Sequence, residues 1–205
     1  MHKIILTTLN ARYTHCSFGL RYIYANMNEL QEVTGICEFV KSDSINEITE
    51  KILSDKPLIV GIGVYIWNAS ETSKLVKLLK IVSPETIVIL GGPEVSHLPL
   101  RIDFDSADYI IQGESDLEFY KLVKSILDGT EQSERIIRAD ISNLVEIKLP
   151  YEYYTDEDIK NRVIYVEASR GCPFTCEFCL SSIDKLVRKF NTEILLKEFD
   201  KLWER

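Results

Sequence analysis

The stretch TIVILGGPE, residues 86–94, decides the fold of this 205-residue chain. The four apolar residues after Thr86 carry no charge and are typical of a strand that is buried on both faces of a sheet. This strand runs straight into Gly91 and Gly92, which allow a sharp turn and a close approach of the backbone to a ligand. The stretch therefore predicts one strand of a parallel sheet with a ligand-accessible turn at its end.

Four further strands are expected on either side of this one, at residues 3–9, 36–40, 58–64 and 108–113. Helical patterns lie between these strands. They are expected at about 18–32, from the capping-box pair Ser44 and Glu47 onward, from near Asn68 onward, and at 115–127. Parallel neighbours need crossover connections, which these helices supply. The sequence thus predicts an α/β fold with a doubly wound five-stranded parallel sheet, flavodoxin-like or Rossmann-like. With a strand order of 2-1-3-4-5, the ligand crevice lies between strands one and three.

Charge and hydropathy restrict the partners of the chain. The formal net charge of −8 argues against nucleic acid, because binding to the phosphate backbone needs clustered Lys and Arg. The N-terminal stretch MHKIILTTLN lacks the features of a signal peptide. The longest apolar run, residues 58–67, is far shorter than the ~20 residues that cross a bilayer. We therefore expect a cytoplasmic protein without a membrane partner, in which clustered cysteines are metal ligands or catalytic groups.

The sequence divides into three parts. Residues 1–130 carry the alternating strands and helices, and residues 131–162 read as an ordered linker with the aromatic patch LPYEYY. Residues 163–205 contain an expected strand at 163–169, a cysteine-bearing loop and a helix from about Thr192 to Glu204. One β–loop–α unit cannot bury its own faces. We therefore expect residues 163–205 to be the truncated start of a second domain.

Three of the five cysteines lie close together, at Cys172, Cys176 and Cys179. Three thiolates from one short loop can hold three corners of a [4Fe–4S] cluster and leave the fourth iron open to a small molecule. Zinc is the alternative, but a structural zinc site normally has four ligands in two pairs. Cys16 and Cys37 lie more than a hundred residues away, and no histidine is near. The spacing therefore favours an iron–sulfur cluster.

The stretch CPFTCEFC, residues 172–179, resembles the signature of the radical S-adenosylmethionine superfamily, including the aromatic Phe178. The resemblance implies that the three cysteines hold a [4Fe–4S] cluster and that the amino and carboxylate groups of S-adenosylmethionine chelate the open iron. An electron from an external donor then releases a 5′-deoxyadenosyl radical. It also implies that Phe178 packs near the adenine and that residues 163–205 begin a (β/α) barrel.

Four segments follow strand ends and should meet at one edge of the predicted sheet: residues 10–19, 65–68, 91–94 and 113–115. Gly91 and Gly92 permit close approach of a bulky ligand, and Tyr65 and Trp67 offer flat apolar faces with a polar tip. Their convergence predicts a ligand site at this edge.

These segments resemble the N-terminal cobalamin-binding domain of one large radical S-adenosylmethionine class, in the branch grouped with the anaerobic magnesium-protoporphyrin IX monomethyl ester oxidative cyclase. The stretches that carry the resemblance are LNARYTHCSFGLRY, VGIGVYIWN, ILGGPEVSH and DYIIQGE. It implies cobalamin contacts at the nucleotide tail or corrin edge from Gly91, Gly92, Pro93 and Glu94, with Gly113 and Glu114 also in the binding set. It implies that Asn10, Tyr13, His15, Tyr65, Trp67 and Asn68 line the face that meets the barrel.

One departure from other cobalamin proteins concerns histidine. Many of them use a D-x-H-x-x-G motif whose histidine ligates cobalt, and neither His2, His15 nor His97 lies in such a motif. Either cobalt has no histidine ligand of that kind or the domain has lost cobalamin. His15 is a ligand-facing donor or a hydrogen-bonded loop residue, and His97 is expected on a surface loop.

The resulting hypothesis is the N-terminal part of a cobalamin-dependent radical S-adenosylmethionine enzyme that performs methyl transfer or oxidative cyclisation on a small molecule. The alternatives are a non-catalytic module for cobalamin or another small ligand, and a radical enzyme whose first domain has lost cobalamin. A flavodoxin-type flavin domain is a poorer fit, because residues 10–15 make a poor phosphate cradle. For the piece alone we expect no activity, an absent or unstable cluster, and a homodimer formed through exposed apolar surface.

Overall fold

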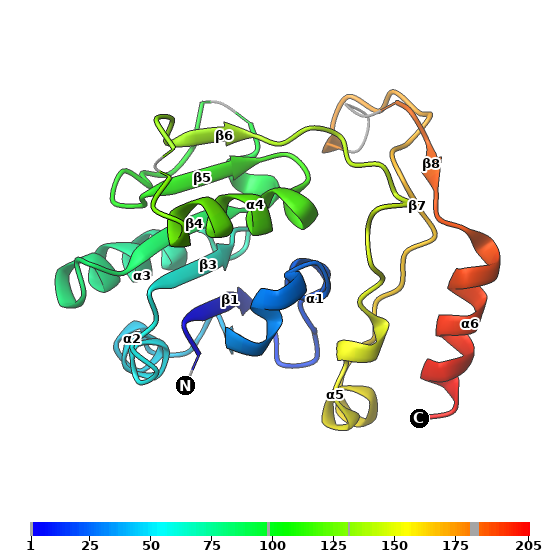
Figure 1. The fold of residues 1–205 in the computed structure, drawn as a ribbon, viewed down its shortest axis with the longest axis horizontal. Helices are drawn as coiled ribbons and strands as arrows, with labels where there is room; N and C mark the ends of the chain where they lie inside the picture. Colours follow the sequence, from blue (N-terminus) through cyan, green and yellow to red (C-terminus); the bar gives the residue numbers. More distant parts are fainter. Residues whose placement is uncertain (1, 98, 131, 181–184) are drawn as a thin grey trace.

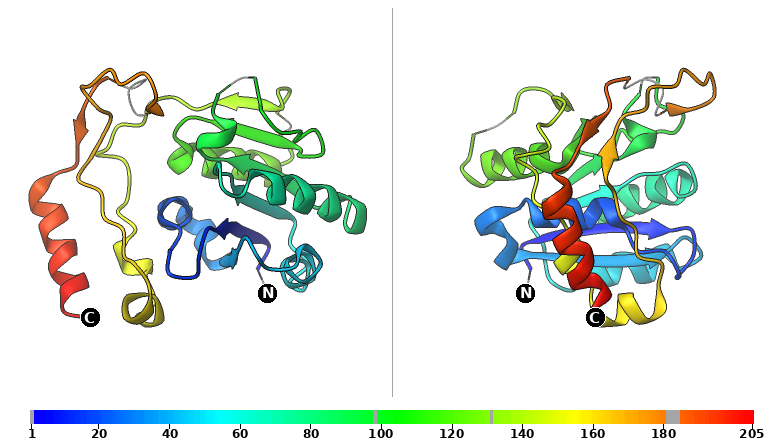
Figure 2. Two further views of the ribbon diagram at one scale, coloured as in Figure 1. Left: turned by 180° about the vertical axis from the view of Figure 1, so that it is seen from behind. Right: turned by 90° about the vertical axis from the view of Figure 1, so that its right-hand side faces the viewer.

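The computed structural model describes residues 2–97, 99–130, 132–180 and 185–205. A parallel sheet covered by helices on both faces forms the N-terminal part, and a C-terminal arm lies beside it (Figure 1). The arrowheads of β1, β5 and β6 point toward the arm, so the arm faces the edge where the strands end (Figures 1 and 2). Any ligand at that edge therefore lies between the sheet and the arm.

The sheet has six parallel strands in the order β2-β1-β3-β4-β5-β6. Their bounds are β1 Ile4–Asn10, β2 Thr34–Val40, β3 Ile59–Gly63, β4 Ile87–Gly91, β5 Tyr109–Gln112 and β6 Ile136–Arg138. The expected order of the first five strands is confirmed. The expected count of five was wrong, because residues 136–138, assigned to the linker, pair with β5. A three-residue strand is too short to show a periodic pattern in the sequence.

Each face of the sheet carries its own helices. The bounds are α1 Phe18–Ala25, η1 Asn28–Val33, α2 Ile45–Leu53, α3 Ala69–Val82, η2 Pro93–Val95 and α4 Ser115–Leu127. Ile4 and Leu6 of β1 pack in one core with residues of α1 and α4, whereas Ile5 and Leu9 pack in the other with residues of α2 and α3. This alternation is the two-residue period of a strand that is buried on both sides.

Two expected helix features differ in the structure. The helix expected at 18–32 is divided into α1 and η1, because Asn28 takes a positive φ of 49° that an α-helix does not accommodate. Ser44 precedes α2, but its side chain makes no capping hydrogen bond, so the expected Ser44–Glu47 capping box is not formed.

The C-terminal arm contains η3 Tyr151–Tyr153, α5 Asp156–Asn161, β7 Ser169–Arg170, β8 Arg188–Lys189 and α6 Thr192–Trp203. The strand expected at 163–169 was wrong over most of its length. Val163 forms an isolated bridge with His15, and β7 pairs antiparallel with β8. Residues 165 and 167 bond instead to tyrosine hydroxyls, because no neighbouring strand lies beside them among the described residues. The arm packs on the sheet domain through a small core of Tyr151, Tyr154 and Leu195 with Cys16.

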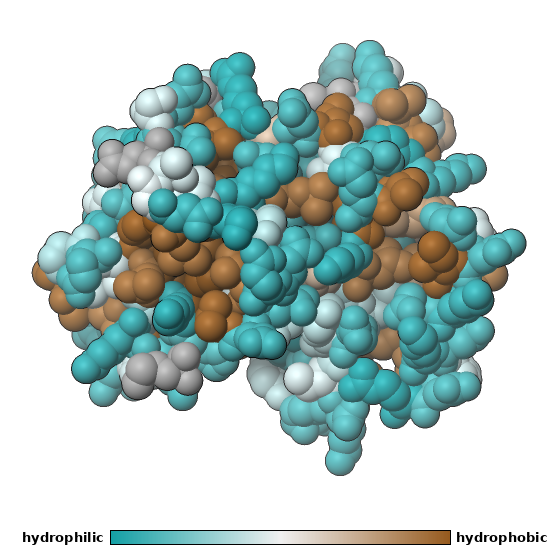
Figure 3. Space-filling model, in the orientation of Figure 1, coloured by the Kyte–Doolittle hydropathy of each residue, from teal (hydrophilic) through white to brown (hydrophobic). Residues whose placement is uncertain are grey.

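Apolar side chains are exposed on the arm, notably Phe174, Phe178, Leu186 and Trp203. Figure 3 shows hydrophobic side chains gathered on the arm as well as on the sheet domain in this view. None of the helices in the described ranges combines the length and the apolar character that crossing a bilayer requires.

Candidate functional site

A cavity of about 290 Å³ lies at the ends of β3, β4 and β5, between α1 and α4. We call it the glycine cavity, because five glycines from the strand ends line it: Gly61, Gly63, Gly91, Gly92 and Gly113. Its apolar walls include Leu20, Ile111 and Phe119. The Phe119 ring and the Val64 backbone fill the space beside Gly61 and Gly92, so the room for a ligand against the backbone lies beside the other three glycines.

Gly92 is required by its conformation and by its surroundings. Its φ is 110°, and a Cβ atom added there would lie 2.6 Å from the carbonyl oxygen of Val64. The Val64 N–H donates to the Gly91 carbonyl at 2.8 Å, so the ends of β3 and β4 are held tightly together. Pro93 and Glu94, both expected to contact a ligand, do not line the cavity. They lie in η2, the short helix that follows β4.

Ser115 is among the residues that line the glycine cavity, and its buried hydroxyl has no hydrogen-bond partner among the described residues. A buried hydroxyl without a partner costs about 1–3 kcal/mol. The position of Ser115 therefore favours a ligand with a hydrogen-bonding group. The hydroxyl of Tyr22, also buried, interacts with Glu167 and Tyr151, and burial raises the pKa of Tyr22, so this phenol stays protonated at neutral pH. Sequence patterns do not single out either residue, because the sequence does not show which buried hydroxyls lack a partner.

A second cavity of about 330 Å³ lies beside the first, at the ends of β1 and β3. We call it the aromatic cavity. Tyr65 and Trp67 are stacked there, with ring centroids 4.5 Å apart and ring planes 6° apart. Phe18 and Tyr65 line both cavities, so the two adjoin. The structure brings together here four of the expected residues, Asn10, His15, Tyr65 and Trp67.

The imidazole of His15 already has a partner. Its Nδ1 lies 2.6 Å from the hydroxyl of Tyr165, which belongs to the arm. His15 thus joins the sheet domain to the arm at the aromatic cavity. His97 lies far from this pair, exposed beside a polar hollow with Arg138.

Two of the expected binding residues serve the fold instead. Asn68 is fully buried, and its amide accepts from the N–H of Tyr65 at 2.8 Å and donates to the carbonyl of Leu9 at 3.0 Å. Tyr13 lies outside both cavities, with the guanidinium of Arg162 over its ring at 4.9 Å. Polar residues that follow a strand are thus also used to tie strand ends together.

Acidic and basic side chains surround the mouth of the glycine cavity. Glu114, Asp116, Glu167 and Arg170 all line it. Glu114, expected to contact a ligand, pairs instead with Arg188 and accepts from the Ser142 N–H at 3.0 Å. Burial alone would raise the pKa of Glu114, but these hydrogen bonds and the nearby arginines lower it. Its carboxylate is therefore ionised and occupied within the protein.

The three cysteines of the predicted cluster form no disulfide and lie between β7 and β8, on the described residues 171–180 and 185–187, which we call the cysteine segment. Cys176 is exposed, and Cys172 and Cys179 are half-buried. Within the described ranges, no three Cys, His, Asp or Glu side chains converge as a metal-binding group. Three thiolates have the donor chemistry of an iron–sulfur cluster. Their role, and that of Phe178, which is 94% exposed, remain predictions.

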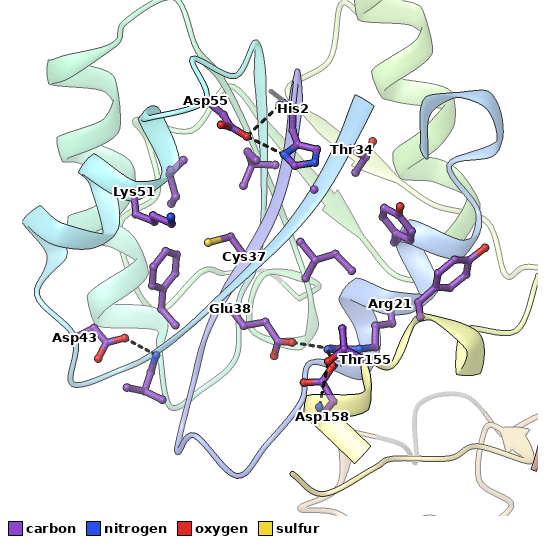
Figure 4. Close-up of a pocket in the computed structure, with 18 of the residues that line it drawn as sticks. His2, Arg21, Thr34, Cys37, Glu38, Asp43, Lys51, Asp55, Thr155 and Asp158 are labelled. Carbon is purple, nitrogen blue, oxygen red and sulfur yellow. Dashed lines mark hydrogen bonds and ion pairs between the residues drawn. The ribbon is translucent and has the colours of Figure 1, made fainter. Parts of the chain in front are cut away.

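A larger groove of about 890 Å³ lies along the outer strand β2, and Arg21 and Tyr24 of α1 also line it (Figure 4). Figure 4 shows Glu38 and Asp158 pointing toward Arg21. Arg21 pairs with Glu38 at 2.7 Å and with Asp158 at 2.8 Å, and Arg162 pairs with Asp158 at 3.0 Å. These four side chains, the ion cluster, join α1, β2 and α5. The charged groups of the ion cluster that line this groove pair with one another.

Residues 4–123 match the family model described as the B12 binding domain. An uncharacterized methyltransferase of Pyrococcus horikoshii is 26% identical over 204 residues, covering 88% of this chain and 44% of that protein. The cobalamin-dependent radical SAM methyltransferase TokK of Streptomyces tokunonensis is 24% identical over 185 residues, covering 76% and 27%. The anaerobic magnesium-protoporphyrin IX monomethyl ester cyclase of Rubrivivax gelatinosus is 25% identical over 161 residues, covering 66% and 29%. The chain therefore spans less than half the length of these relatives.

A solved structure also has a similar fold. The cobalamin-dependent S-adenosylmethionine radical enzyme OxsB, with aqua-cobalamin bound, superposes with a TM-score of 0.75 at 16% identity. The superposition covers 98% of this chain and 31% of that one. The expected fold class and the stated family resemblance are both confirmed.

Proposed function

This chain belongs to the B12-binding domain family, and from that premise we propose that it binds cobalamin at the carboxyl edge of its sheet. The nucleotide tail would enter the glycine cavity, and the corrin would lie over the aromatic cavity. The observation that supports this most directly is a glycine-lined cavity beside the buried hydroxyl of Ser115, which lacks a partner among the described residues.

The residues of both cavities fit such a ligand. The glycine cavity is mostly apolar, which suits an aromatic base, and the unpaired hydroxyl of Ser115 suits a polar atom of that base or its sugar. The stacked rings of Tyr65 and Trp67 offer an apolar surface for a flat macrocycle. Cobalt would have no histidine ligand from a D-x-H-x-x-G motif, since the chain contains none.

We propose further that the longer protein is a cobalamin-dependent radical S-adenosylmethionine enzyme. Cys172, Cys176 and Cys179 would hold a [4Fe–4S] cluster that binds S-adenosylmethionine, with Phe178 beside the adenine. The bound cluster supplies electrons for cleavage of the sulfonium, and cobalamin carries a methyl group or an electron. This chain contributes the cofactor-binding surfaces and the contacts that hold them together. None of the five cysteines forms a disulfide, which suits the reducing cytoplasm.

Methyl transfer to a small molecule is the reaction we favour, because two of the relatives are methyltransferases by name. Oxidative cyclisation is the second candidate, since another relative is a protoporphyrin ester cyclase. The external electron donor is a partner that either reaction requires. The exposed apolar side chains of the arm, such as Phe174 and Trp203, favour self-association of this chain, which light scattering would detect as a dimer.

The test of cobalamin binding uses the chain itself. Purified protein is mixed with hydroxocobalamin, freed of unbound ligand by gel filtration, and examined by its visible spectrum. We expect near-stoichiometric retention by the native chain. The variant Gly63→Val fills the glycine cavity, and its Cβ would meet Thr8 and Tyr65 only at ordinary contact distances of 3.4 and 3.5 Å. It should bind about tenfold or more weakly, a loss of ~1.4 kcal/mol.

Gly35→Val is the matched control, because it makes the same substitution in β2, outside the glycine cavity. Its Cβ would come within 2.9 Å of the ring of His2, a half-exposed side chain that can turn outward if its contact with Asp55 opens. This variant should retain cobalamin like the native chain. A folded native chain that retains none, or a folded Gly63→Val protein that retains as much, would overturn the proposal.

A further inference from the structure

The cysteine segment begins and ends at two arginines that face each other. Arg170 of β7 and Arg188 of β8 are partners in the two-residue antiparallel pair that closes the segment. Both side chains are largely buried, and both guanidinium groups meet carboxylates of the sheet domain. The two ends of the segment are therefore attached to the sheet domain by charge-assisted hydrogen bonds.

Arg170 makes the more directional of the two attachments. Its Nη1 donates to Asp116 Oδ2 at 2.7 Å and its Nη2 to Asp116 Oδ1 at 3.0 Å. Such a two-bond pairing fixes the orientation of the planar guanidinium as well as its distance. The Nε donates to both oxygens of Glu167 at 3.2 Å. The guanidinium also lies over the ring of Tyr22, 4.9 Å from its centroid.

Arg188 makes the second attachment, to Glu114, which lies two residues before Asp116. Its Nη1 donates to Glu114 Oε2 at 3.2 Å and to the carbonyl of Ser142 at 2.9 Å, and its Nη2 donates to the other oxygen of Glu114. Burial lowers the pKa of Arg170, but Asp116 and Glu167 outweigh it and raise that pKa, so the clamp keeps its charge.

The two acceptors flank a residue of the glycine cavity. Glu114 and Asp116 stand on either side of Ser115, at the start of α4. Ser115, Asp116 and Arg170 all line the cavity. The turn that closes the cavity is therefore also the turn that holds both ends of the cysteine segment.

We propose that Arg170 with Asp116, and Arg188 with Glu114, form a double clamp that sets the position of the cysteine segment relative to a ligand in the glycine cavity. All four are positioning residues. The inference rests on the proposed function, since it assumes cobalamin in that cavity. Two arginines on separate strands, held by two carboxylates on one turn of chain, restrict both translation and rotation of the segment, which a single contact does not.

The test measures the distance between the two sites directly. A nitroxide is attached to Cys176 in a chain with Cys37, Cys172 and Cys179 changed to serine, Cys16 being buried. The labelled chain is loaded with cob(II)alamin, and the cobalt–nitroxide distance distribution is recorded by pulsed electron paramagnetic resonance. Arg170→Gln and Asp116→Asn should each broaden that distribution about twofold, and Arg170→Lys should broaden it less, because Lys keeps the charge but not the two-bond geometry.

Glu118→Gln is the control, since it removes a carboxylate from the same helix at an exposed pair with Lys121. It should leave the distribution unchanged. A native chain that binds no cob(II)alamin overturns the proposed function. Bound cob(II)alamin with the same distribution in Arg170→Gln and Asp116→Asn overturns the clamp and leaves the proposed function standing. If Arg170→Gln does not fold, Asp116→Asn decides from the other side of the contact.

Discussion

At the scale of single residues, two glycines outside the strands have different reasons to be glycine. Gly92 and Gly129 both have a positive φ, of 110° and 71°. A Cβ at Gly92 would meet the carbonyl oxygen of Val64 at 2.6 Å, whereas a Cβ at Gly129 would meet nothing within 4 Å. The two positions therefore separate backbone strain from steric overlap.

We expect Gly129→Ala to lower the free energy of unfolding by about 1 kcal/mol, the cost of the left-handed conformation alone. Gly92→Ala should lower it by roughly 3 kcal/mol or more, because the ends of β3 and β4 must also separate. Urea unfolding followed by circular dichroism measures both values. Equal losses in the two variants would show that the contact with Val64 relaxes freely.

The sequence identifies residues near the site better than it identifies residues in it. Asn10, His15, Tyr65 and Trp67 were expected at one edge and do line one cavity. Asn68 and Glu114 were expected there too, but their polar atoms bond within the protein. Position after a strand predicts proximity to the site, whereas the direction of a side chain depends on partners that are distant in sequence. The same reason hid the roles of Tyr22, Ser115 and Arg170.

At the scale of elements, the hydroxyls of Tyr151 and Tyr154 replace a neighbouring strand. Tyr154 accepts from the N–H of Tyr165 at 3.2 Å and donates to the carbonyl of the same residue at 3.0 Å. Tyr151 makes the same pair of bonds to Glu167, both at 3.1 Å. Both tyrosines are almost fully buried, so their hydroxyls are held in place.

The double variant Tyr151→Phe, Tyr154→Phe should lose about 1 kcal/mol of stability for each hydroxyl. Amide hydrogen exchange at Tyr165 and Glu167 should accelerate about tenfold, because the opened state needs to break fewer bonds. Tyr153→Phe is the control, since its hydroxyl only accepts from Gln31 at 3.1 Å. Unchanged exchange in the double variant would mean that packing alone holds residues 165–167.

The ion cluster joins three elements and makes stability depend on pH. Burial alone would raise the pKa of Asp158, but bonds from the Thr155 N–H and from Arg162, and the charge of Arg21, hold it well below its usual range. A carboxylate with a lowered pKa stabilises the folded protein at pH values above its unfolded pKa of about 3.9, and this stabilisation is lost as the pH falls.

The free energy of unfolding should therefore decrease as the pH falls from about 6 to 3, and Asp158→Asn should flatten that decrease. The variant should also be less stable at pH 6, because Arg21 and Arg162 lose an ionised partner. Asp105→Asn, at an exposed position, should keep the native slope. Identical slopes in Asp158→Asn and the native chain would assign the acid sensitivity to other carboxylates.

Elements that bury many apolar residues were predicted well, and elements that depend on distant partners were not. The first five strands and their order follow from apolar runs and helical crossovers. Strand β6 has three residues and exists because β5 offers a free edge. The apolar run at 163–169 has the composition of a strand, but without a neighbouring backbone its hydrogen bonds go to tyrosines. Composition sets what a segment prefers, and tertiary contacts decide what it forms.

At the scale of the whole molecule, ligand binding should stabilise the sheet domain by mass action. Cobalamin at about 100 times its dissociation constant adds ~2.7 kcal/mol to the free energy of unfolding. For a chain of this length that raises the melting temperature by roughly 5–10 °C. Circular dichroism at 222 nm, with ligand-only blanks, measures the shift.

Two controls locate the stabilising contact. Cobinamide, which lacks the nucleotide tail, should raise the melting temperature less than cobalamin does, because it leaves the glycine cavity empty. Gly63→Val should abolish the difference between the two ligands. Equal shifts for cobalamin and cobinamide in the native chain would place the binding energy outside the glycine cavity.

The ring of Tyr22 lies between the glycine cavity and the start of the cysteine segment. Tyr22 lines the glycine cavity, and the guanidinium of Arg170, at the start of the cysteine segment, lies over its ring. A ligand that contacts Tyr22 from the glycine cavity therefore contacts the same ring on which Arg170 packs. Ligand binding in the glycine cavity and the position of the cysteine segment are thus coupled through one side chain.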